Sequence, residues 1–415
     1  FKQKTAYEML RSLVGSEMCI RDSSRSAAVA LAAAGSDSCV LVRRKAKMKP
    51  KPTLFVLVGG GGDSAVERAL RSARQAAACD LVETLLAGGL AERAVVATDD
   101  DAWTACLARL PVEVDVDPPE EPFHFGRRLA DLIRRYKGRR VLYAGGGSAP
   151  LMASDSWQEA LVEFGTNGAA LVTNNLHSSD WVAFYPGEDF LPLLAAQEQD
   201  NALAWVLAHE AGVPARALPP SAASRFDLDT PADLLIARTH PRVGVHLRRA
   251  LDRLNWPAEP VEQMLAVLDR EGGHVAVVGR SSATAWQALE RATQCWVRFF
   301  AEERGMIASG RLRRGEVRSL LAGLLERVGV DGFFAALAEL AEAVFLDNRV
   351  ILAARGLWPS AADRFNADLF RWQDVQEPFL RRFSCAAAGA GVPILMGGQS
   401  VVNGGLLALL EVLEV

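Results

Sequence analysis

The feature that most constrains the fold is the alternation of short apolar runs with helix-forming segments between residues 53 and 236. Each apolar run ends in glycines or in polar residues before the next helical stretch begins. Strands that alternate with helices form mostly parallel sheets covered by helices on both faces. The pattern therefore predicts a three-layer α/β domain of Rossmann-like topology. Its unusual loops should gather at the carboxyl ends of the strands, where such sheets bind ligands.

The apolar runs are short, and several are rich in β-branched and aromatic residues, as expected of buried strands. We predict strands at 53–58, 94–98, 112–116, 140–144, 169–173 and 181–184. We predict helices between and after them at 65–78, 125–136, 157–164, 201–209 and 232–238.

The composition changes near Pro241, where helical periodicity becomes dominant. The segments with this periodicity are 247–254, 260–269, 283–304, 315–328 and 332–344, and the short apolar runs that could be strands are 274–278, 350–353 and 393–396. The predicted organisation is a leader at 1–52, an α/β domain at 53–240 and a mainly α-helical domain at 241–415. The sequence assigns no role to that last domain, although its helices could form a homodimer.

The first residues differ in character from the rest of the chain. Residues 1–23 resemble a translated sequencing adapter, and the chain begins without Met, so we expect this segment to be artefactual. A signal peptide is the competing interpretation, but the segment has no continuous apolar core. The stretch up to Pro52 is rich in Ala and Ser and then basic, which favours a disordered leader over an anion-binding tail.

The charge balance excludes several classes of protein. Lys and Arg number 46 against 50 Asp and Glu, which gives a net charge of −4 and no excess of positive charge for a dedicated nucleic-acid binder. The six cysteines include no C-x-x-C pair, which is typical of reduced thiols in a cytoplasmic protein. No apolar run reaches the roughly 18 residues of a membrane helix. We therefore expect neither a nucleic acid nor a membrane as partner.

Four consecutive glycines follow the first predicted strand: Gly59, Gly60, Gly61 and Gly62, with Asp63 next. Without a Cβ, glycine lets backbone N–H groups approach a phosphate closely, and the helix that follows favours an anion at its start. The loop could equally be a conformational turn with no ligand, because no Gly-Lys-Ser/Thr motif follows. The three aspartates at 99–101 similarly favour helix capping over a ligand site.

Two carboxylates in the segment FDLDTPADL are spaced for metal binding. Asp227 and Asp229 are two residues apart, so an extended backbone points them the same way and both could hold one hard divalent cation, Mg²⁺. Thr230 and Pro231 then begin a helix. The alternative interpretation is that Asp227 only ties down the start of that helix.

A polar loop follows the predicted strand at 169–173. Asn174, Asn175, His177, Ser178 and Asp180 are dense in hydrogen-bond donors and acceptors, which favours a substrate site. These are also ordinary turn residues, so the loop alone does not require a ligand.

Taken together, these motifs resemble the nucleotidyltransferases of the GT-A-like fold, which include guanylyl- and cytidylyltransferases that activate small phosphorylated metabolites. FDLDTPADL is similar to the D-[IL]-D-T-P-x-D-L motif of that family. LFVLVGGGGDS stands where the family has its first glycine loop, and GGGSAPLM stands where it has G-D-x-P. The order and approximate spacing match over some 185 residues.

The resemblance implies roles for individual residues. It implies nucleotide binding by the first glycine loop and by Gly146, Gly147 and Ser148, and a Mg²⁺ held by the two aspartates near the end of the domain. It implies acceptor binding by the polar loop at 174–180, with Arg225 nearby. The implied reaction transfers a nucleoside monophosphate from a triphosphate to a phosphorylated or carboxylate acceptor, with release of pyrophosphate.

The sequence departs from the family at two points. The first glycine loop is not followed by Arg-Met, and the loop at 145–148 lacks the metal-binding Asp of G-D-x-P. A missing carboxylate weakens the neutralisation of polyphosphate charge. A non-catalytic protein that senses a nucleotide or metabolite through this domain is therefore the alternative hypothesis.

Overall fold

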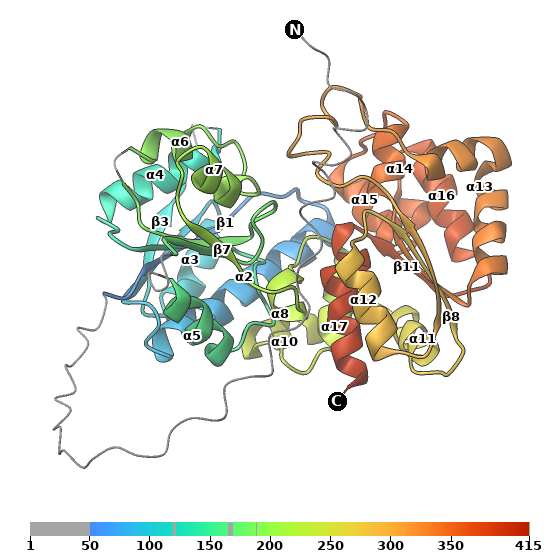
Figure 1. Cartoon of the computed structure of the whole chain (residues 1–415), viewed down its shortest axis with the longest axis horizontal. Helices are drawn as coiled ribbons and strands as arrows, with labels where there is room; N and C mark the ends of the chain where they lie inside the picture. Colours follow the sequence, from blue (N-terminus) through green and yellow to red (C-terminus); the bar gives the residue numbers. More distant parts are fainter. Residues whose placement is uncertain (1–49, 119–121, 165–168, 188, 415) are drawn as a thin grey trace, which may run out of the picture. The chain divides into compact units, whose positions relative to one another are not determined.

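The computed structural model describes residues 50–118, 122–164, 169–187 and 189–414, which form one compact unit with two sheets (Figure 1). The predictions for residues 1–49 lie outside the described residues. None of the described helices is long and apolar enough to span a membrane. The cysteines of the described part, at 79, 106, 295 and 385, are free thiols.

The first sheet has seven strands in the order β3-β2-β1-β4-β6-β5-β7. Its strands are β1 (Thr53–Val58), β2 (Arg93–Thr98), β3 (Glu113–Val116), β4 (Val141–Gly145), β5 (Leu171–Thr173), β6 (Trp181–Phe184) and β7 (Ala215–Ala217). β1 pairs in parallel with β2 and β4, whereas β6 runs antiparallel to both β4 and β5. The predicted α/β class and mostly parallel sheet are confirmed.

Helices cover both faces of this sheet because its strands are apolar on both sides. Alternate β1 residues enter different cores: Leu54 and Val56 pack with α2 and α5, and Phe55 and Leu57 pack with α4 and α7. The helices are α2 (Ala65–Ala87), α3 (Asp101–Leu107), α4 (Phe125–Arg135), α5 (Ser154–Glu163), α6 (Leu191–Ala195), α7 (Leu203–His209), α8 (Ala222–Arg225) and α9 (Pro231–Thr239). This is the predicted three-layer arrangement.

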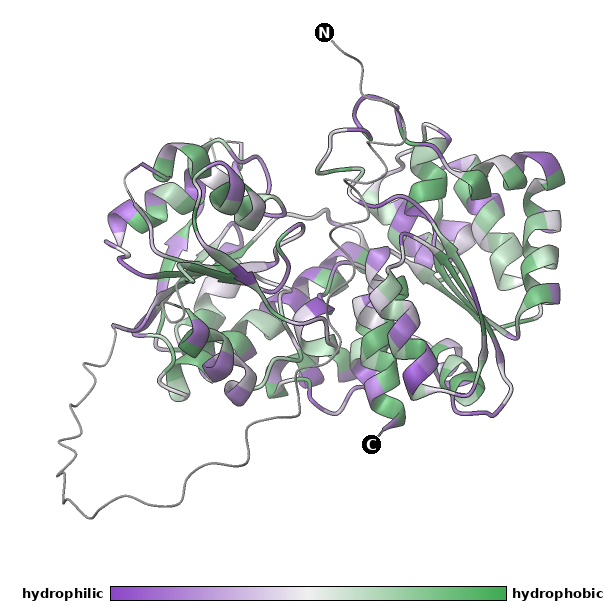
Figure 2. Ribbon diagram, viewed as in Figure 1, coloured by the Kyte–Doolittle hydropathy of each residue, from purple (hydrophilic) through white to green (hydrophobic). Residues whose placement is uncertain are grey.

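The second region has more helix than strand, as expected, but it is built on a parallel sheet with the order β11-β10-β8-β9. Its strands are β8 (His274–Gly279), β9 (Trp296–Ala301), β10 (Ala343–Asp347) and β11 (Ile394–Gly397). Its helices are α10 (Val245–Asp252), α11 (Glu259–Leu268), α12 (Ala283–Ala292), α13 (Leu320–Leu340), α14 (Arg349–Ala354), α15 (Ala361–Asp368), α16 (Pro378–Ala388) and α17 (Gly404–Leu413), with 3₁₀ turns η1 (Trp372–Asp374) and η2 (Gln399–Val402). Figure 2 shows the apolar strands of this sheet between its helices.

Three element predictions in this region were wrong. The helix predicted at 332–344 ends at Leu340, and the unpredicted strand β10 begins at Ala343. The single helix predicted at 283–304 ends at Ala292, and β9 follows it. The run at 350–353, predicted as a strand, lies in α14. Short runs that are apolar on all sides fit both a strand and a buried helix, so periodicity does not separate them.

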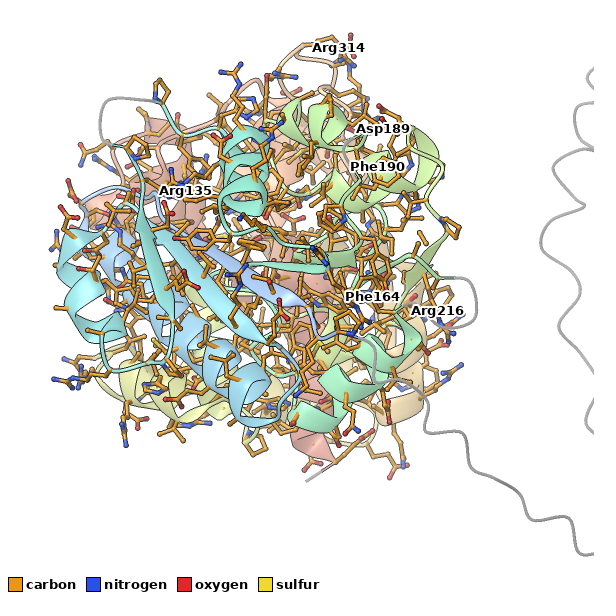
Figure 3. The ribbon with its side chains drawn as sticks, turned by 90° about the vertical axis from the view of Figure 1, so that its left-hand side faces the viewer. Arg135, Phe164, Asp189, Phe190, Arg216 and Arg314 are labelled. Atoms are coloured by element: carbon orange, nitrogen blue, oxygen red, sulfur yellow. The ribbon has the colours of Figure 1, made fainter. Side chains whose placement is uncertain are left out.

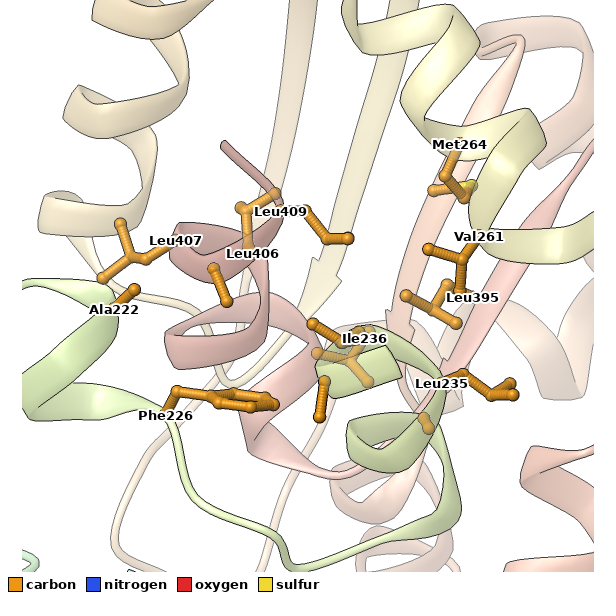
Figure 4. Packing of buried hydrophobic residues seen from close by; sticks show 14 of the residues in the cluster. Ala222, Phe226, Leu235, Ile236, Val261, Met264, Leu395, Leu406, Leu407 and Leu409 are labelled. Carbon is orange, nitrogen blue, oxygen red and sulfur yellow. The ribbon is translucent and has the colours of Figure 1, made fainter. Parts of the chain in front are cut away.

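One hydrophobic core joins the helices of the first region to the second sheet (Figure 4). It contains Leu70 and Ala73 of α2, Ile236 of α9, and residues of the second sheet such as Phe345 and Leu395. Leu406 and neighbouring leucines of α17 lie among them. The second sheet is therefore packed directly against the helices of the first.

His240, directly after α9, is a buried titratable group at this junction, only 1% exposed. Its Nδ1 accepts a hydrogen bond from the Arg242 N–H at 3.2 Å. Burial lowers the pKa of His240 from 6.5 to about 4, and the charges of Arg242 and Arg248 act in the same direction.

We predict that His240→Asn makes the free energy of unfolding less dependent on pH between about 4 and 6.5. Between pH 6.5 and 4 the unfolded chain binds a proton at His240 that the folded chain does not, so stability falls as the pH drops through this window. The full effect is on the order of 1–3 kcal/mol, because the Glu411 carboxylate 3.5 Å from Nε2 opposes the effect of burial. Urea unfolding from pH 4 to 7.5 should show a smaller pH slope for His240→Asn. The same change at the exposed His177 should leave the slope as in the parent, and an unaltered slope for His240→Asn would contradict the prediction.

Candidate functional site

One cleft of about 1110 Å³ opens at the carboxyl ends of β1, β2 and β4. Eight residues predicted from the sequence line it: Gly59, Gly60, Gly146, Gly147, Ser148, Asp180, Asp227 and Asp229. Their positions in the chain span some 170 residues, so the fold brings separate motifs to one place. The volume suits a nucleotide-sized ligand. A smaller hollow of about 490 Å³ lies far along the chain, at residues 270–274 and 338–342.

The glycine loop after β1 has a fixed conformation. Gly60 and Gly61 have φ of 75° and 100°, which favour glycine. Arg71 of α2 donates to the carbonyls of Gly60, Gly61 and Gly62 at 3.3, 2.8 and 3.0 Å. The N–H of Gly60 donates to Asp99 at 2.9 Å, and the N–H of Gly62 donates to Glu67 at 3.1 Å. Carboxylates therefore already occupy two of the N–H groups that a phosphate would use.

The second glycine loop is required by close packing. A Cβ on Gly146 would lie 2.8 Å from the Val58 methyl groups, and a Cβ on Gly147 would lie 3.0 Å from the Leu228 carbonyl. The N–H of Leu228 donates to the Gly147 carbonyl at 3.1 Å. The loop thus places β1 and the segment 226–229 against each other at the floor of the cleft.

The segment from Phe226 to Asp229 is extended, so its side chains alternate. Phe226 and Leu228 are buried, at 1% and 0% exposure, in the core that joins the helices of the first region to the second sheet. Asp227 and Asp229 point the other way and line the cleft. The sequence prediction that the two carboxylates share one side agrees with this arrangement.

Two contacts hold Asp229 in place. Asp233, in the first turn of α9, is fully buried and accepts hydrogen bonds from the N–H groups of Asp229 and Thr230 at 3.0 and 2.6 Å. Arg74 of α2 donates to the Leu228 carbonyl at 2.6 Å and to the Asp229 carboxylate at 3.0 Å. The exposed ion pair of Arg74 and Asp229 itself contributes little to stability.

Asp180 stands directly before β6 and is positioned by Asn174. The buried Asn174 donates to the Asp180 carboxylate, and its side-chain oxygen accepts from the Asp180 N–H at 3.0 Å. The hydroxyl of Ser148 donates to the Asp180 carbonyl at 2.7 Å. Asn174 therefore lies behind the cleft wall, where it orients Asp180.

The carboxylates of the cleft interact electrostatically. Burial, followed by the charges of Asp229 and Asp200, raises the pKa of Asp180 to about 8. Burial, followed by the charges of Asp229 and Asp180, holds the pKa of Asp227 well above its usual range. Carboxylates crowded in this way favour a cation or a proton among them.

Several predicted residues lie outside the cleft lining: Gly61, Gly62, Asp63, Asn174, Asn175, His177, Ser178 and Arg225. Asn175 accepts a hydrogen bond from the His177 N–H at 3.2 Å within its own turn. Ser178 donates to Asn201 at 2.9 Å. Asp63 and His177 are exposed.

Other residues of the cleft have no clear sequence signal. Asp200 accepts from the Tyr143 hydroxyl at 2.8 Å, and burial raises the pKa of Asp200. Asp99 lines the cleft, whereas Asp100 caps α3, as the capping interpretation predicted. Phe123 is 62% exposed at the cleft and offers an aromatic face to a ligand. These residues come from loops whose sequences read as ordinary turns.

The cleft offers two neighbouring carboxylates that could bind Mg²⁺, but not a complete set of protein ligands around it. Among the residues that the structure describes, no group of three or more His, Cys, Asp or Glu side chains lies in metal-binding geometry. Mg²⁺ usually binds one or two carboxylates and completes its shell with waters and substrate phosphates. Asp227 and Asp229, both facing the cleft, supply that number.

Comparisons with known proteins give structural likenesses only. No family model and no curated protein matches the chain. A cytidylyltransferase from Leptospira borgpetersenii is similar, with a TM-score of 0.35 and 15% identity over 46% of this chain and 86% of that one. A nucleotidyl transferase from Methanothermobacter thermautotroptrophicus has a TM-score of 0.32 and 18% identity over 40% and 85%. A CMP:2-keto-3-deoxy-manno-octonic acid synthetase complexed with CTP has 0.31 and 10% over 40% and 89%.

We predict that Asp180→Asn stabilises the metal-free protein. The folded-state pKa of Asp180 is raised, so ionising it costs stability as the pH rises from about 3.8 to about 8, and the amide removes that cost. At pH 8 the gain should be at least about 1 kcal/mol, because burial is the largest cause of the raised pKa and the amide has no charge to desolvate. Urea unfolding in EDTA at pH 5 and pH 8 measures it. A variant that is less stable than the parent at pH 8 would refute the electrostatic account.

Proposed function

We propose that the chain is a nucleotidyltransferase. It binds a nucleoside triphosphate in the cleft over Gly59 and Gly60 and transfers the nucleoside monophosphate to a small anionic acceptor. The observation that carries this proposal is the convergence of two glycine loops and three carboxylates, Asp180, Asp227 and Asp229, on the wall of one cleft.

The proposed roles follow from the contacts of each group. Asp227 and Asp229 would hold Mg²⁺, which when bound supplies positive charge to the triphosphate. Asp180 would bring a third carboxylate to the side of the cleft where the loop at 145–148 has none. The hydrogen bond from Ser148 to the Asp180 carbonyl links that loop to the carboxylate.

The proposed reaction needs positioning more than covalent chemistry. An oxygen of the acceptor attacks the α-phosphorus, the bond from that phosphorus to the bridging oxygen of pyrophosphate breaks, and pyrophosphate leaves. An acceptor phosphate or carboxylate is already ionised near neutral pH, so no base is required to activate it. The protein would contribute alignment and fixed charge.

One observation favours a non-catalytic nucleotide sensor instead. The N–H groups of Gly60 and Gly62 already donate to Asp99 and Glu67, so a triphosphate must displace these carboxylates or bind beside them. A protein that binds a nucleotide weakly and reports its concentration would tolerate this competition. Turnover separates the two functions.

We predict that at least one of ATP, CTP, GTP and UTP, with Mg²⁺, raises the melting temperature of the full chain. Asp227→Asn should abolish the Mg²⁺-dependent part of the shift, because the cation loses one of its two carboxylates. Thermal unfolding with each nucleotide, with Mg²⁺ or with EDTA, measures this. The matched control is Asp252→Asn, which removes an exposed carboxylate on α10.

The second measurement is pyrophosphate release from the stabilising nucleotide with a panel of phosphorylated and carboxylate acceptors. Release that is lost in Asp227→Asn but kept in Asp252→Asn supports the enzyme. A thermal shift without release from any acceptor supports the sensor. If none of the four nucleotides shifts the melting temperature, both the enzyme and the sensor hypotheses are wrong.

A further inference from the structure

We propose that a second copy of this chain docks on the outer side of β9, so that two second sheets join in antiparallel fashion across a two-fold axis. The surface consists of Trp296 and Phe300 of β9 with Leu320, Leu324 and Val328 of α13, and we call it the β9 edge. The proposal does not rest on the proposed function.

β9 is a sheet edge without the usual protection against pairing. Its six residues include one charged side chain, Arg298, whose guanidinium donates to the Leu340 carbonyl at 2.7 Å. The edges of the first sheet are β3, which carries Glu113 and Asp115, and β7, which has three residues. The other edge strand of the second sheet, β11, is fully buried. Proteins shorten, charge or cover the edges that must stay unpaired, whereas an exposed apolar edge is a template for another strand.

The backbone of β9 has free hydrogen-bonding groups on its outer side. The Trp296 N–H donates to the Gly273 carbonyl, directly before β8, at 2.8 Å, and the strands then pair in parallel without interruption. The even-numbered residues therefore bond to β8, and the N–H and C=O groups of residues 297, 299 and 301 point outward. In the part of the chain that the structure describes, no hydrogen bond reaches these outward groups. One side of β9 is thus open to a further strand.

The side chains of Trp296, Arg298 and Phe300 lie on the face of the sheet that α13 covers. Arg298 is in register with Ala276, and Phe300 is in register with Val278. Both β8 residues pack in the core that contains α13, and registered neighbours point to the same face. Figure 1 shows α13 on this face and α12 on the other. Trp296 is nevertheless 68% exposed and Phe300 36% exposed, so α13 leaves this face of β9 uncovered.

α13 begins beside the carboxyl end of β9. The Ser319 hydroxyl and the Leu321 N–H donate to the carboxylate of Glu302, the residue directly after β9, at 2.8 and 3.0 Å. Leu320 lies between these two donors and is 86% exposed. An apolar side chain therefore stands in solvent at the end of β9 that is opposite to Trp296.

An apolar stripe continues along α13 from Leu320. Leu324 and Val328 follow at intervals of four residues, so all three lie on one side of the helix. Glu326 is on the opposite side, where it forms an ion pair at 3.2 Å with Arg355, which follows α14. Since α14 itself follows β10, the stripe lies on the side of α13 away from β10, which is the side of β9.

The loop from β9 to α13 bends toward the first region. Arg313 of this loop forms an ion pair at 3.2 Å with Glu198. In Figure 3 the adjacent Arg314 lies at the same edge of the molecule as Asp189 and Phe190, just before α6. The loop therefore leaves the outer side of β9 open.

The surface is complementary to itself under a two-fold axis. Antiparallel pairing with Phe299 of each copy on the axis places residue 298 opposite residue 300, and residue 296 opposite residue 302. Arg298 then stands beside the Phe300 ring of the second copy, so like charges do not meet. Trp296 meets the start of α13 of the second copy, where Leu320 lies. These two are the most exposed large apolar side chains of the described residues, and each would cover the other.

The area of the β9 edge approaches that of a stable interface. A standard interface buries about 800 Å² on each partner. The exposed fractions of the five side chains correspond to on the order of 600 Å² per copy, and the edge backbone and the polar groups around it add to this. A two-fold axis doubles every contact, which favours a second copy over an unrelated partner.

Sedimentation velocity of the full chain tests the proposal. We expect a species of twice the 44.7 kDa of the chain. Leu320→Lys and Trp296→Lys should each weaken dimerisation at least tenfold, because each change acts at two symmetric contacts. Ala301→Pro removes an outward N–H from an exposed residue and no bond to β8, so it should weaken the dimer as well. The matched control is Val245→Lys on α10, a side chain that is 60% exposed, and it should dimerise like the parent.

A second measurement tests the antiparallel arrangement. Residues 296 and 320 stand at opposite ends of β9, about 20 Å apart at roughly 3.3 Å per residue, which is too far for a disulfide within one chain. The double variant Trp296→Cys/Leu320→Cys should therefore form a covalent dimer on oxidation, and neither single variant should. The proposal is overturned if the parent is a monomer at every soluble concentration, if the Lys variants dimerise like the control, or if the double variant gives no more covalent dimer than the single variants.

Discussion

The structure depends on how the extended segment 226–229 is held. Leu228 donates its N–H to the Gly147 carbonyl, and its own carbonyl accepts from Arg74. The buried side chains of Phe226 and Leu228 pack in the core between the second sheet and the helices of the first region. Because side chains alternate along an extended segment, Asp227 and Asp229 then point into the cleft. The burial of Phe226 and Leu228 therefore fixes the positions of the two carboxylates. A shift of the segment by one residue would expose the two apolar side chains and bury the charged ones. Packing of the second region therefore helps to fix the positions of Asp227 and Asp229 in the first.

The second sheet contacts the residues that directly follow this segment, at the start of α9. A Cβ on Gly397 or Gly398 would lie 3.0 Å from Ala232 or Thr230, so only glycine lets β11 come this close. Behind this contact Arg349 binds Asp368, with both side chains nearly inaccessible, and Arg280 binds Asp347. Removing one member of such a buried pair costs roughly 3–5 kcal/mol, because the other charge stays buried without a partner. The two ion pairs therefore hold side chains at or just after the carboxyl ends of β8 and β10.

Most of the first sheet could be predicted from local sequence, because β1 to β6 each combine an apolar run with a terminal glycine or polar cluster. β7 could not, since its three residues are exposed and give no such signal. β9 could not, since Trp296 to Ala301 is a partly exposed edge strand without clean alternation, and its aromatic residues also fit a helix. The convergence of Asp227 and Asp229 followed from their spacing, whereas the contact between Arg74 and Leu228 joins residues 154 positions apart and has no local signal. Asn174 was predicted at the site, but its hydrogen bonds to Asp180 make it a support for that carboxylate.

The loop at 145–148 has no carboxylate of its own and packs closely against the segment 226–229. The three glycines and Ser148 keep that loop small, so Leu228 can pack against Gly147. A Cβ added to Gly147 would lie only 3.0 Å from the Leu228 carbonyl oxygen. A side chain at Gly147 would therefore displace the very segment that carries Asp227 and Asp229. Ser148 instead binds the backbone of Asp180, which lines the cleft directly before the neighbouring antiparallel strand β6. With Pro150 aligned to the proline of G-D-x-P, Ser148 stands at the position of the family's aspartate. In the proposed function the hydrogen bond from Ser148 to the Asp180 carbonyl ties that position to a carboxylate on another element.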